Sequence, residues 1–256
     1  MDRAQLDQLF DLSGRVAIVT GGTRGIGRAI AEGFAAAGAD VVVASRKADA
    51  CAETQAALEA MGGGALGVPT HLGEPDDLRA LVDATVERFG GVDIVVNNAA
   101  TALAQMIEDI TPDAWQKVFD VNLRGPVLLT QAALPHLRAS EHGAVINVVS
   151  VGAFLFSTYT SMYASAKAGL LQYTRSMAAE FAPDGIRVNA LAPGTVDTDM
   201  VRANPPEAQE RMANAALLRR AAHPDELVGP ALLLASDAGS FVTGQCLVVD
   251  GGLAPR

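Results

Sequence analysis

Continuous apolar runs alternate with helix-like segments along the chain. The apolar runs, which predict strands, cover residues 16–22, 39–45, 64–70, 92–100, 143–150, 185–194 and 245–252. Apolar residues at helical spacing predict helices over 25–38, 48–64, 74–90, 159–182 and 223–237, with two more within 111–140. Continuous apolar strands are typical of parallel sheets buried on both faces. We therefore predict an α/β fold with a seven-stranded parallel sheet, helices on both faces and right-handed crossovers.

Residues 195–222 form the longest break in this alternation. The segment is polar and contains Pro205 and Pro206. Long insertions near the carboxyl end of a parallel sheet often cover a site. We predict that 195–222 is a substrate lid within one domain spanning 1–256; a surface helical excursion is the alternative.

The composition argues against several classes of binding partner. The formal net charge is −10 without a basic cluster, which argues against nucleic acid. No run of about 18 apolar residues is present, so no membrane span is predicted. Cys51 and Cys246 lie far apart in the sequence and show no metal-ligand spacing. The N-terminal stretch lacks a signal-peptide core, and we predict a cytoplasmic protein.

A glycine cluster, TGGTRGIG at 20–27, follows the first predicted strand and opens a helix. Gly21 permits a sharp turn, Gly25 lets the backbone approach a pyrophosphate, and Gly27 lets the helix pack closely on the strand. Free N–H groups at the start of the helix attract phosphates. This context predicts a dinucleotide site.

The end of the second strand bears on which dinucleotide binds. A cofactor without the 2′-phosphate usually meets a carboxylate there, but Ser45 stands at that position and Arg46 and Lys47 follow. Asp40 is at the wrong end of the strand, and Arg24 is expected to point to the same region as the two cations. We predict NADP(H) in preference to NAD(H), which stays open, as does a merely solvated turn at 46–47.

Tyr163 and Lys167 are four apart on a predicted helix and therefore share a face. An ammonium close to a phenol favours the phenolate. We expect Lys167, together with the positive nicotinamide ring of a bound cofactor, to lower the pKa of Tyr163 from about 10 toward neutrality. Such a tyrosine exchanges protons with a carbonyl oxygen, and Ser150, at the end of a strand, can hydrogen-bond the same oxygen. An amphipathic helix face and a strand end are the structural alternatives.

Five ordered motifs resemble the short-chain dehydrogenase/reductase family: TGGTRGIG, NNAA at 97–100, Ser150, YASAK at 163–167 and NALAPG at 189–194. The resemblance covers essentially the whole chain. It implies one Rossmann-type domain, a nicotinamide cofactor and a homotetramer or homodimer. It also implies a catalytic set of Asn122, Ser150, Tyr163 and Lys167, with Lys167 holding the nicotinamide ribose and Asn122 anchoring a proton-relay water.

The resemblance further implies the cofactor contacts, with Tyr163 and Lys167 again among them. The other predicted contacts are Gly21, Thr23, Arg24, Gly25, Ile26, Gly27, Ser45, Arg46, Lys47, His71, Leu72, Asn98, Ala99, Ala100, Pro193, Gly194, Val196 and Thr198. Two positions depart from the family pattern. Ala100 replaces a common glycine, and His71 replaces a common aspartate that contacts adenine.

The residues near Ser150 and Tyr163 predict an apolar substrate pocket. Phe154, Leu155, Phe156, Leu103 and Met200 are the expected wall, together with Ala100 and Thr101. A small-molecule ketone or secondary alcohol is therefore expected, as for the NADP-dependent carbonyl reductases of the dehydrogenase/reductase member 4 type that the chain resembles. Alternatives are a 3-oxoacyl-[acyl-carrier-protein] reductase, a gluconate-type sugar dehydrogenase and, from another class, a non-catalytic NADP-sensing protein. No metal site is predicted.

Overall fold

The fold is taken from a computed structural model, in which residues 1–254 are described. Within these residues, seven parallel strands form one sheet in the order β3-β2-β1-β4-β5-β6-β7, which confirms the predicted α/β architecture. The strands are β1 Val16–Thr20, β2 Asp40–Ser45, β3 Ala65–Pro69, β4 Ile94–Asn97, β5 Ala144–Val148, β6 Arg187–Pro193 and β7 Cys246–Val249.

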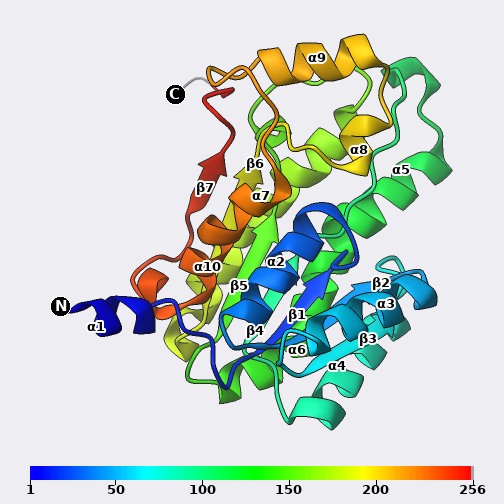
Figure 1. The fold of residues 1–256 in the computed structure, drawn as a ribbon. Coiled ribbons are helices and arrows are strands. Elements are labelled where there is room, and N and C mark those ends of the chain that lie inside the picture. The colour runs from blue at the N-terminus through cyan, green and yellow to red at the C-terminus, as the bar shows by residue number, and fades with distance from the viewer. Residues whose placement is uncertain (255–256) are drawn as a thin grey trace.

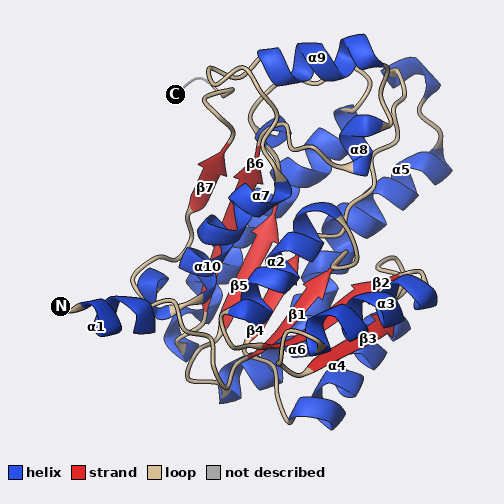
Figure 2. Cartoon of the chain, viewed as in Figure 1, coloured by secondary structure: helices blue, strands red, loops and turns tan. Residues whose placement is uncertain are grey.

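Helices cover both faces of the sheet (Figure 2). The longer helices are α2 Gly25–Ala36, α3 Ala48–Glu59, α4 Pro75–Phe89, α5 Pro112–Phe119, α6 Gly125–Ala139, α7 Ser161–Phe181, α9 Pro206–Asn214 and α10 Val228–Ala235. Short helical elements are α1 Arg3–Gln8, α8 Asp199–Arg202, η1 Ile107–Asp109, η2 Asp120–Arg124, η3 Val151–Ala153, η4 Ala182–Asp184, η5 Pro224–Leu227 and η6 Asp237–Gly239.

Alternate residues of each strand enter different cores because successive side chains point to opposite faces. Ala17 and Val19 of β1 pack in the core that includes α2 and α10, whereas Ile18 packs in the core that includes α4, α6 and α7. The central strands are therefore apolar at every position, as the continuous runs in the sequence indicated.

Two differences from the predicted elements have physical causes. The helix expected from residue 223 starts as the 3-10 turn η5, where His223 and Glu226 form a reciprocal capping arrangement, and α10 ends at Ala235. Between α5 and α6, the wider π turn η2 keeps the chain helical, so the two predicted helices are continuous.

The segment 195–222 is held at both of its ends. Val196 and Ala222 form an isolated parallel bridge, with hydrogen bonds from Asp197 N–H to the Ala222 carbonyl and from Ala222 N–H to the Thr195 carbonyl, both 2.9 Å. Between these ends lie α8 and α9, at the end of the molecule toward which β6 points (Figure 1). No helix among residues 1–254 is long and apolar enough to cross a membrane.

Candidate active site

A cavity of about 440 Å³ opens at the carboxyl ends of the parallel strands. Connections after β1, β2, β4, β5 and β6 contribute to it, which is where open α/β sheets place their ligands. The predicted site residues in its lining are Gly21, Thr23, Arg24, Gly25, Ile26, Ser45, Arg46, Lys47, His71, Leu72, Asn98, Ala99, Ala100, Ser150, Tyr163, Lys167, Pro193, Gly194, Val196 and Thr198.

The glycine loop is shaped by backbone conformation and close packing. Gly21 and Gly25 have φ values of +64° and +54°, in the region that favours glycine. A Cβ atom on Gly27 would lie 2.3 Å from both the Asn98 Nδ2 and the Gly21 carbonyl oxygen. Gly27 is outside the described lining of the cavity, so its part is packing of α2 against β1 and β4.

Asn98 holds the start of this loop from the neighbouring strand. Its side-chain amide donates to the Thr20 carbonyl at 2.8 Å, and its backbone N–H donates to the Thr20 hydroxyl at 3.0 Å. The first N–H groups of α2 have no side-chain cap, since Arg24 at the N-cap accepts no hydrogen bond through its side chain. The loop therefore presents backbone donors to the cavity, the chemistry that a pyrophosphate needs.

Two cations, and no carboxylate of the described residues, line the cavity at the end of β2. Ser45, Arg46 and Lys47 all line the cavity. Asp40, at the opposite end of the strand, accepts the Gly64 N–H at 2.9 Å. Asp40 begins β2, at the end of the strand that the sequence indicated, and it is not among the residues of 1–254 that line the cavity.

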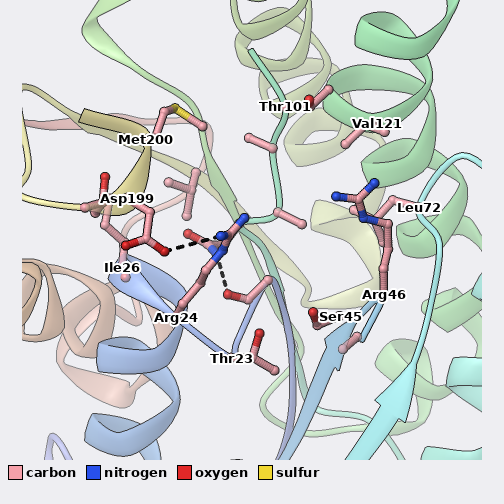
Figure 3. A pocket seen from close by; sticks show the side chains of 18 of the residues that line it. Thr23, Arg24, Ile26, Ser45, Arg46, Leu72, Thr101, Val121, Asp199 and Met200 are labelled. Carbon is pink, nitrogen blue, oxygen red and sulfur yellow. Dashed lines mark hydrogen bonds and ion pairs between the residues drawn. The ribbon is translucent and has the colours of Figure 1, made fainter. Parts of the chain in front are cut away.

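Arg24 makes a contact that the sequence did not predict. Its guanidinium lies 3.3 Å from the Asp199 carboxylate, and in Figure 3 it lies between Asp199 and Arg46. The two residues are 175 positions apart, so the pairing could not be read from the loop sequence. Arg24 lines the cavity as expected, but the structure does not direct it solely at the Arg46 region.

Tyr163, Ser150 and Lys167 meet at the end of β5. The hydroxyl groups of Tyr163 and Ser150 are hydrogen-bonded to each other, and Ser150 Oγ also accepts the Gly152 N–H at 3.1 Å. Lys167 is fully buried and donates from Nζ to the Val148 carbonyl at 2.6 Å. Its ammonium lies 5.8 Å from the centre of the Tyr163 ring.

The protein groups around Tyr163 do not by themselves lower its pKa. Burial raises the pKa of the Tyr163 phenol, and the hydrogen bond with Ser150 only partly opposes that shift. Burial also lowers the pKa of Lys167 to about 7. Because desolvation disfavours both charged forms, the pair consists of a protonated phenol beside an amine that titrates near neutrality.

Asn122 supports the cavity from behind its described lining. Its side-chain oxygen accepts the Thr101 N–H at 3.1 Å, and its amide group donates to the carbonyls of Thr101 at 2.7 Å and Val118 at 2.8 Å. The fully buried Asn122 lies in the π turn η2. The wide turn thus lets one amide fix the backbone of the loop after β4.

His71 and Leu72, at the adenosine end of the prediction, both line the cavity but differ in burial. Leu72 is buried, whereas the His71 ring accepts the Gly73 N–H at Nδ1, 3.1 Å away. His71 N–H donates to Asp77 at 2.8 Å. The histidine therefore lines the cavity while its ring also stabilises its own turn.

The nicotinamide end of the prediction lies after β6. A Cβ on Gly194 would approach the Asp250 Cα to 2.7 Å, so only glycine fits there. A Cβ on Gly25 would lie 3.1 Å from Thr198 Cγ2, which shows how closely this segment approaches the glycine loop.

The predicted apolar wall is only partly present in the lining. Ala100, Thr101 and Met200 line the cavity. Phe154 and Phe156 are exposed, the latter at 97%, and residues 154–156 and Leu103 lie outside the described lining. The connection after η3 carries these aromatic side chains outward, which the apolar composition of 151–159 did not indicate.

Several lining residues are not among the predicted site residues. They are Ala50, Thr70, Lys117, Val121, Asp199 and Val201, together with strand-end residues Ala44, Val148 and Val149. Lys117 and Val121 are four apart, and Val121 precedes the predicted Asn122, so helical spacing back from that asparagine could have found both. Among residues 1–254, no group of three or more metal-ligating side chains is close enough to hold a metal.

Comparison with known proteins agrees with this geometry. Residues 21–254 match a family model described as enoyl-(acyl carrier protein) reductase. Dehydrogenase/reductase SDR family member 4 of Homo sapiens is 38% identical over 248 residues, covering 96% of this chain and 89% of that protein.

Two solved structures are also similar. A dehydrogenase/reductase from Sinorhizobium meliloti 1021 superposes with a TM-score of 0.94 at 32% identity, covering 98% of this chain and 100% of that one. A blue fluorescent protein from a metagenomic library, in complex with NADPH, has a TM-score of 0.91 at 33% identity, covering 96% and 100%.

Proposed function

Because the chain belongs to the short-chain dehydrogenase/reductase family and is therefore an NAD(P)-dependent oxidoreductase of alcohols and carbonyl compounds, we propose that it is an NADP(H)-dependent, carbonyl reductase-like enzyme for apolar substrates. The observation that carries this proposal is the hydrogen-bonded pair of Tyr163 and Ser150 beside the buried Lys167, in the same cavity as the glycine loop.

The residues present fit a nicotinamide dinucleotide. The glycine loop offers backbone donors, and Cβ atoms at Gly25, Gly27 or Gly194 would crowd their neighbours. We propose that the predicted cofactor contacts hold such a group along the cavity. When bound, the cofactor supplies the hydride in carbonyl reduction or accepts it in alcohol oxidation.

The preference for the phosphorylated cofactor rests on charge. Arg46 and Lys47 follow β2, and the Asp40 carboxylate is bound to Gly64 at the other end of that strand. Cations favour a 2′-phosphate, whereas a carboxylate at this position would favour the free ribose hydroxyls. In support, a solved structure 33% identical to this chain is a complex with NADPH.

We assign the proton transfer to Tyr163. Because burial raises its pKa, the phenol is protonated at neutral pH and can donate to a carbonyl oxygen. Ser150 would hydrogen-bond the same oxygen, and its own Oγ is already oriented by the Gly152 N–H. In the oxidation direction the proton moves the other way, so the Tyr163 phenol must first release its own proton and then accept the alcohol proton as the phenolate.

Lys167 and Asn122 complete the assigned set. The short bond from Lys167 Nζ to the Val148 carbonyl places its ammonium next to the tyrosine ring, at the end of β5. Asn122 acts on the site through Thr101, whose backbone it holds from both its N–H and its carbonyl. We propose that Lys167 contacts the cofactor and that Asn122 is a positioning residue.

The substrate class follows from the cavity wall beside these groups. Ala100 and Met200 are apolar, and Met200 belongs to α8 in segment 195–222, which we propose closes over the substrate as a lid. The alternative, reduction of 3-oxoacyl groups on acyl carrier protein, has one specific support, the description of the matching family model. The net charge of −10 disfavours an acidic carrier protein.

We also propose a homodimer or homotetramer. β7 lies at one edge of the sheet and is only partly buried, and Phe241 just before it is fully exposed. An apolar sheet edge invites pairing with another copy. Light scattering on the purified chain should give a multiple of 26.4 kDa; a monomer at micromolar concentration would contradict this.

A substrate panel tests the proposed function. Apolar ketones, an acyl-thioester and gluconate-type sugars would each be assayed with NADPH and NADH by the nicotinamide absorbance. Tyr163→Phe should keep NADPH binding but lose turnover by about 10²-fold or more. Tyr173→Phe, at an exposed position on the same helix, is the control. Tight NADPH binding without turnover of any substrate would favour an NADP-sensing protein.

A further inference from the structure

We propose that Asp199 determines cofactor selectivity, because it competes with the cofactor phosphate for Arg24. The Arg24 guanidinium, which the glycine loop supplies, is 3.3 Å from the Asp199 carboxylate at the start of α8. Both side chains are largely exposed to solvent at 73% and 61%. An ion pair in that setting is weak, so another anion can replace one of its partners.

The charges around the cavity make Asp199 exceptional. Within the described residues, it is the only acidic side chain in the lining, whereas Arg24, Arg46, Lys47, Lys117 and Lys167 are all basic. Of these cations, only Arg24 makes an ion pair or hydrogen bond with a carboxylate of residues 1–254. Asp199 thus neutralises one cation of a site that is otherwise arranged for a polyanion.

The position of Arg24 allows it to bind either the Asp199 carboxylate or a phosphate of the cofactor. In Figure 3, its guanidinium lies between Asp199 on one side and Arg46 on the other. A 2′-phosphate held at Arg46 and Lys47 would attract the Arg24 guanidinium by a stronger, doubly charged interaction. Asp199 would then lose its partner while facing the same phosphate.

This exchange also concerns the lid. Thr198, one residue before Asp199, packs so close to the glycine loop that a Cβ on Gly25 would be 3.1 Å from its Cγ2. The ion pair is therefore a second tie between α8 and the loop. A ligand with a 2′-phosphate releases that tie and loosens α8, whereas the same ligand without the phosphate leaves it intact.

The inference rests on the proposed preference for NADP(H), and the probes separate the two. Binding of 2′,5′-ADP and of 5′-AMP, which differ in the 2′-phosphate, would be measured by calorimetry. Asp199→Asn should tighten 2′,5′-ADP about two- to fivefold and leave 5′-AMP unchanged. Glu32→Gln, which removes one charge from the Arg28–Glu32 ion pair on α2, is the matched control and should change neither.

A double variant tests whether Asp199 acts on cofactor selectivity through Arg24. In an Arg24→Ala background, Asp199→Asn should no longer increase the selectivity for 2′,5′-ADP, because no guanidinium is left to be freed. If Asp199→Asn has no selective effect, or has the same effect without Arg24, the competition is refuted. If Arg46→Ala does not weaken the binding of 2′,5′-ADP, the assignment of the 2′-phosphate site to Arg46 is overturned. The comparison with and without Arg24 still tests the competition with Asp199.

Hydrogen exchange gives the second readout. Saturating 2′,5′-ADP should speed exchange of amides in 199–204 relative to saturating 5′-AMP in the wild-type chain. In Asp199→Asn, the two ligands should give the same exchange there. Equal exchange with both ligands in the wild type would overturn the coupling to α8.

Discussion

Replacing Lys167 by methionine should stabilise the fold while it removes the activity. Lys167 is buried without a carboxylate partner among the described residues, and its Nζ donates to the Val148 carbonyl. Burial alone lowers its pKa from 10.5 to about 7. At about 1.4 kcal/mol per pKa unit, this desolvation costs about 4 to 5 kcal/mol for the charged form.

Methionine keeps a long apolar chain at this position and removes the desolvation cost. It also leaves the Val148 carbonyl without its donor, which costs about 1 to 3 kcal/mol. The net expectation for Lys167→Met at pH 7 is a gain of about 1 to 4 kcal/mol in the free energy of unfolding. For a chain of this size, that raises Tm by about 2 °C or more.

The pH dependence gives the sharper measurement. Between about pH 7 and pH 10, the unfolded chain carries a proton on Lys167 that the folded chain has lost. The wild-type stability contributed by this group therefore rises with pH across that window, because the unfolded state binds more protons. The advantage of Lys167→Met should be largest at or below pH 7 and shrink toward pH 10.

Urea unfolding at several pH values measures both effects. Lys117→Met, at an exposed lysine of α5, is the control and should change stability by no more than about 0.5 kcal/mol. A Lys167→Met variant that is less stable than the wild type at pH 7 would refute the reasoning. So would a difference in stability that stays constant from pH 7 to pH 10.

Three further predictions concern the glycine loop, the loop after β4 and the tyrosine. Gly27→Ala should weaken cofactor binding in fluorescence titrations and lower Tm, since its Cβ would overlap Asn98 and Gly21; Gly229→Ala, whose Cβ meets nothing within 4 Å, should not. Asn122→Ala should destabilise the fold by about 2 to 4 kcal/mol in urea and speed amide exchange at Thr101, and unchanged exchange there would contradict its positioning role. In the free chain, the ultraviolet difference between wild type and Tyr163→Phe should show no phenolate below pH 10, because burial raises the pKa of Tyr163; ionisation near pH 7 would contradict this.

The sequence predicts the strands and the glycine loop because both depend on local chemistry. Continuous apolar runs mark strands buried on two faces, and the spacing of glycines marks the sharp turn before α2. Helix α1 was not predicted, because none of its residues is buried and its start depends on a reciprocal cap between Asp2 and Gln5. A helix without an apolar face leaves no periodic signal.

The sequence predicts many of the residues that line the cavity, but it does not predict their pKa shifts or ion pairs. Spacing placed Tyr163 and Lys167 on one face of α7, and both line the cavity. Their pKa directions depend on the desolvation that the whole packed cavity imposes, which no local pattern encodes. The ion pair between Arg24 and Asp199 likewise joins residues that only the folded chain brings together.

The bridge between Val196 and Ala222 joins the two ends of the excursion beyond β6, so the fold of the sheet depends little on the residues between them. The chain between the bridged ends can lengthen, shorten or change sequence with little strain on β6. The reason is that the entropy cost of closing a loop grows only slowly with its length. The same scaffold can therefore accept grafted substrate-recognition modules. Exchange of 200–221 between relatives should transfer substrate preference while the cofactor contacts and the proton-transfer chemistry stay with the recipient.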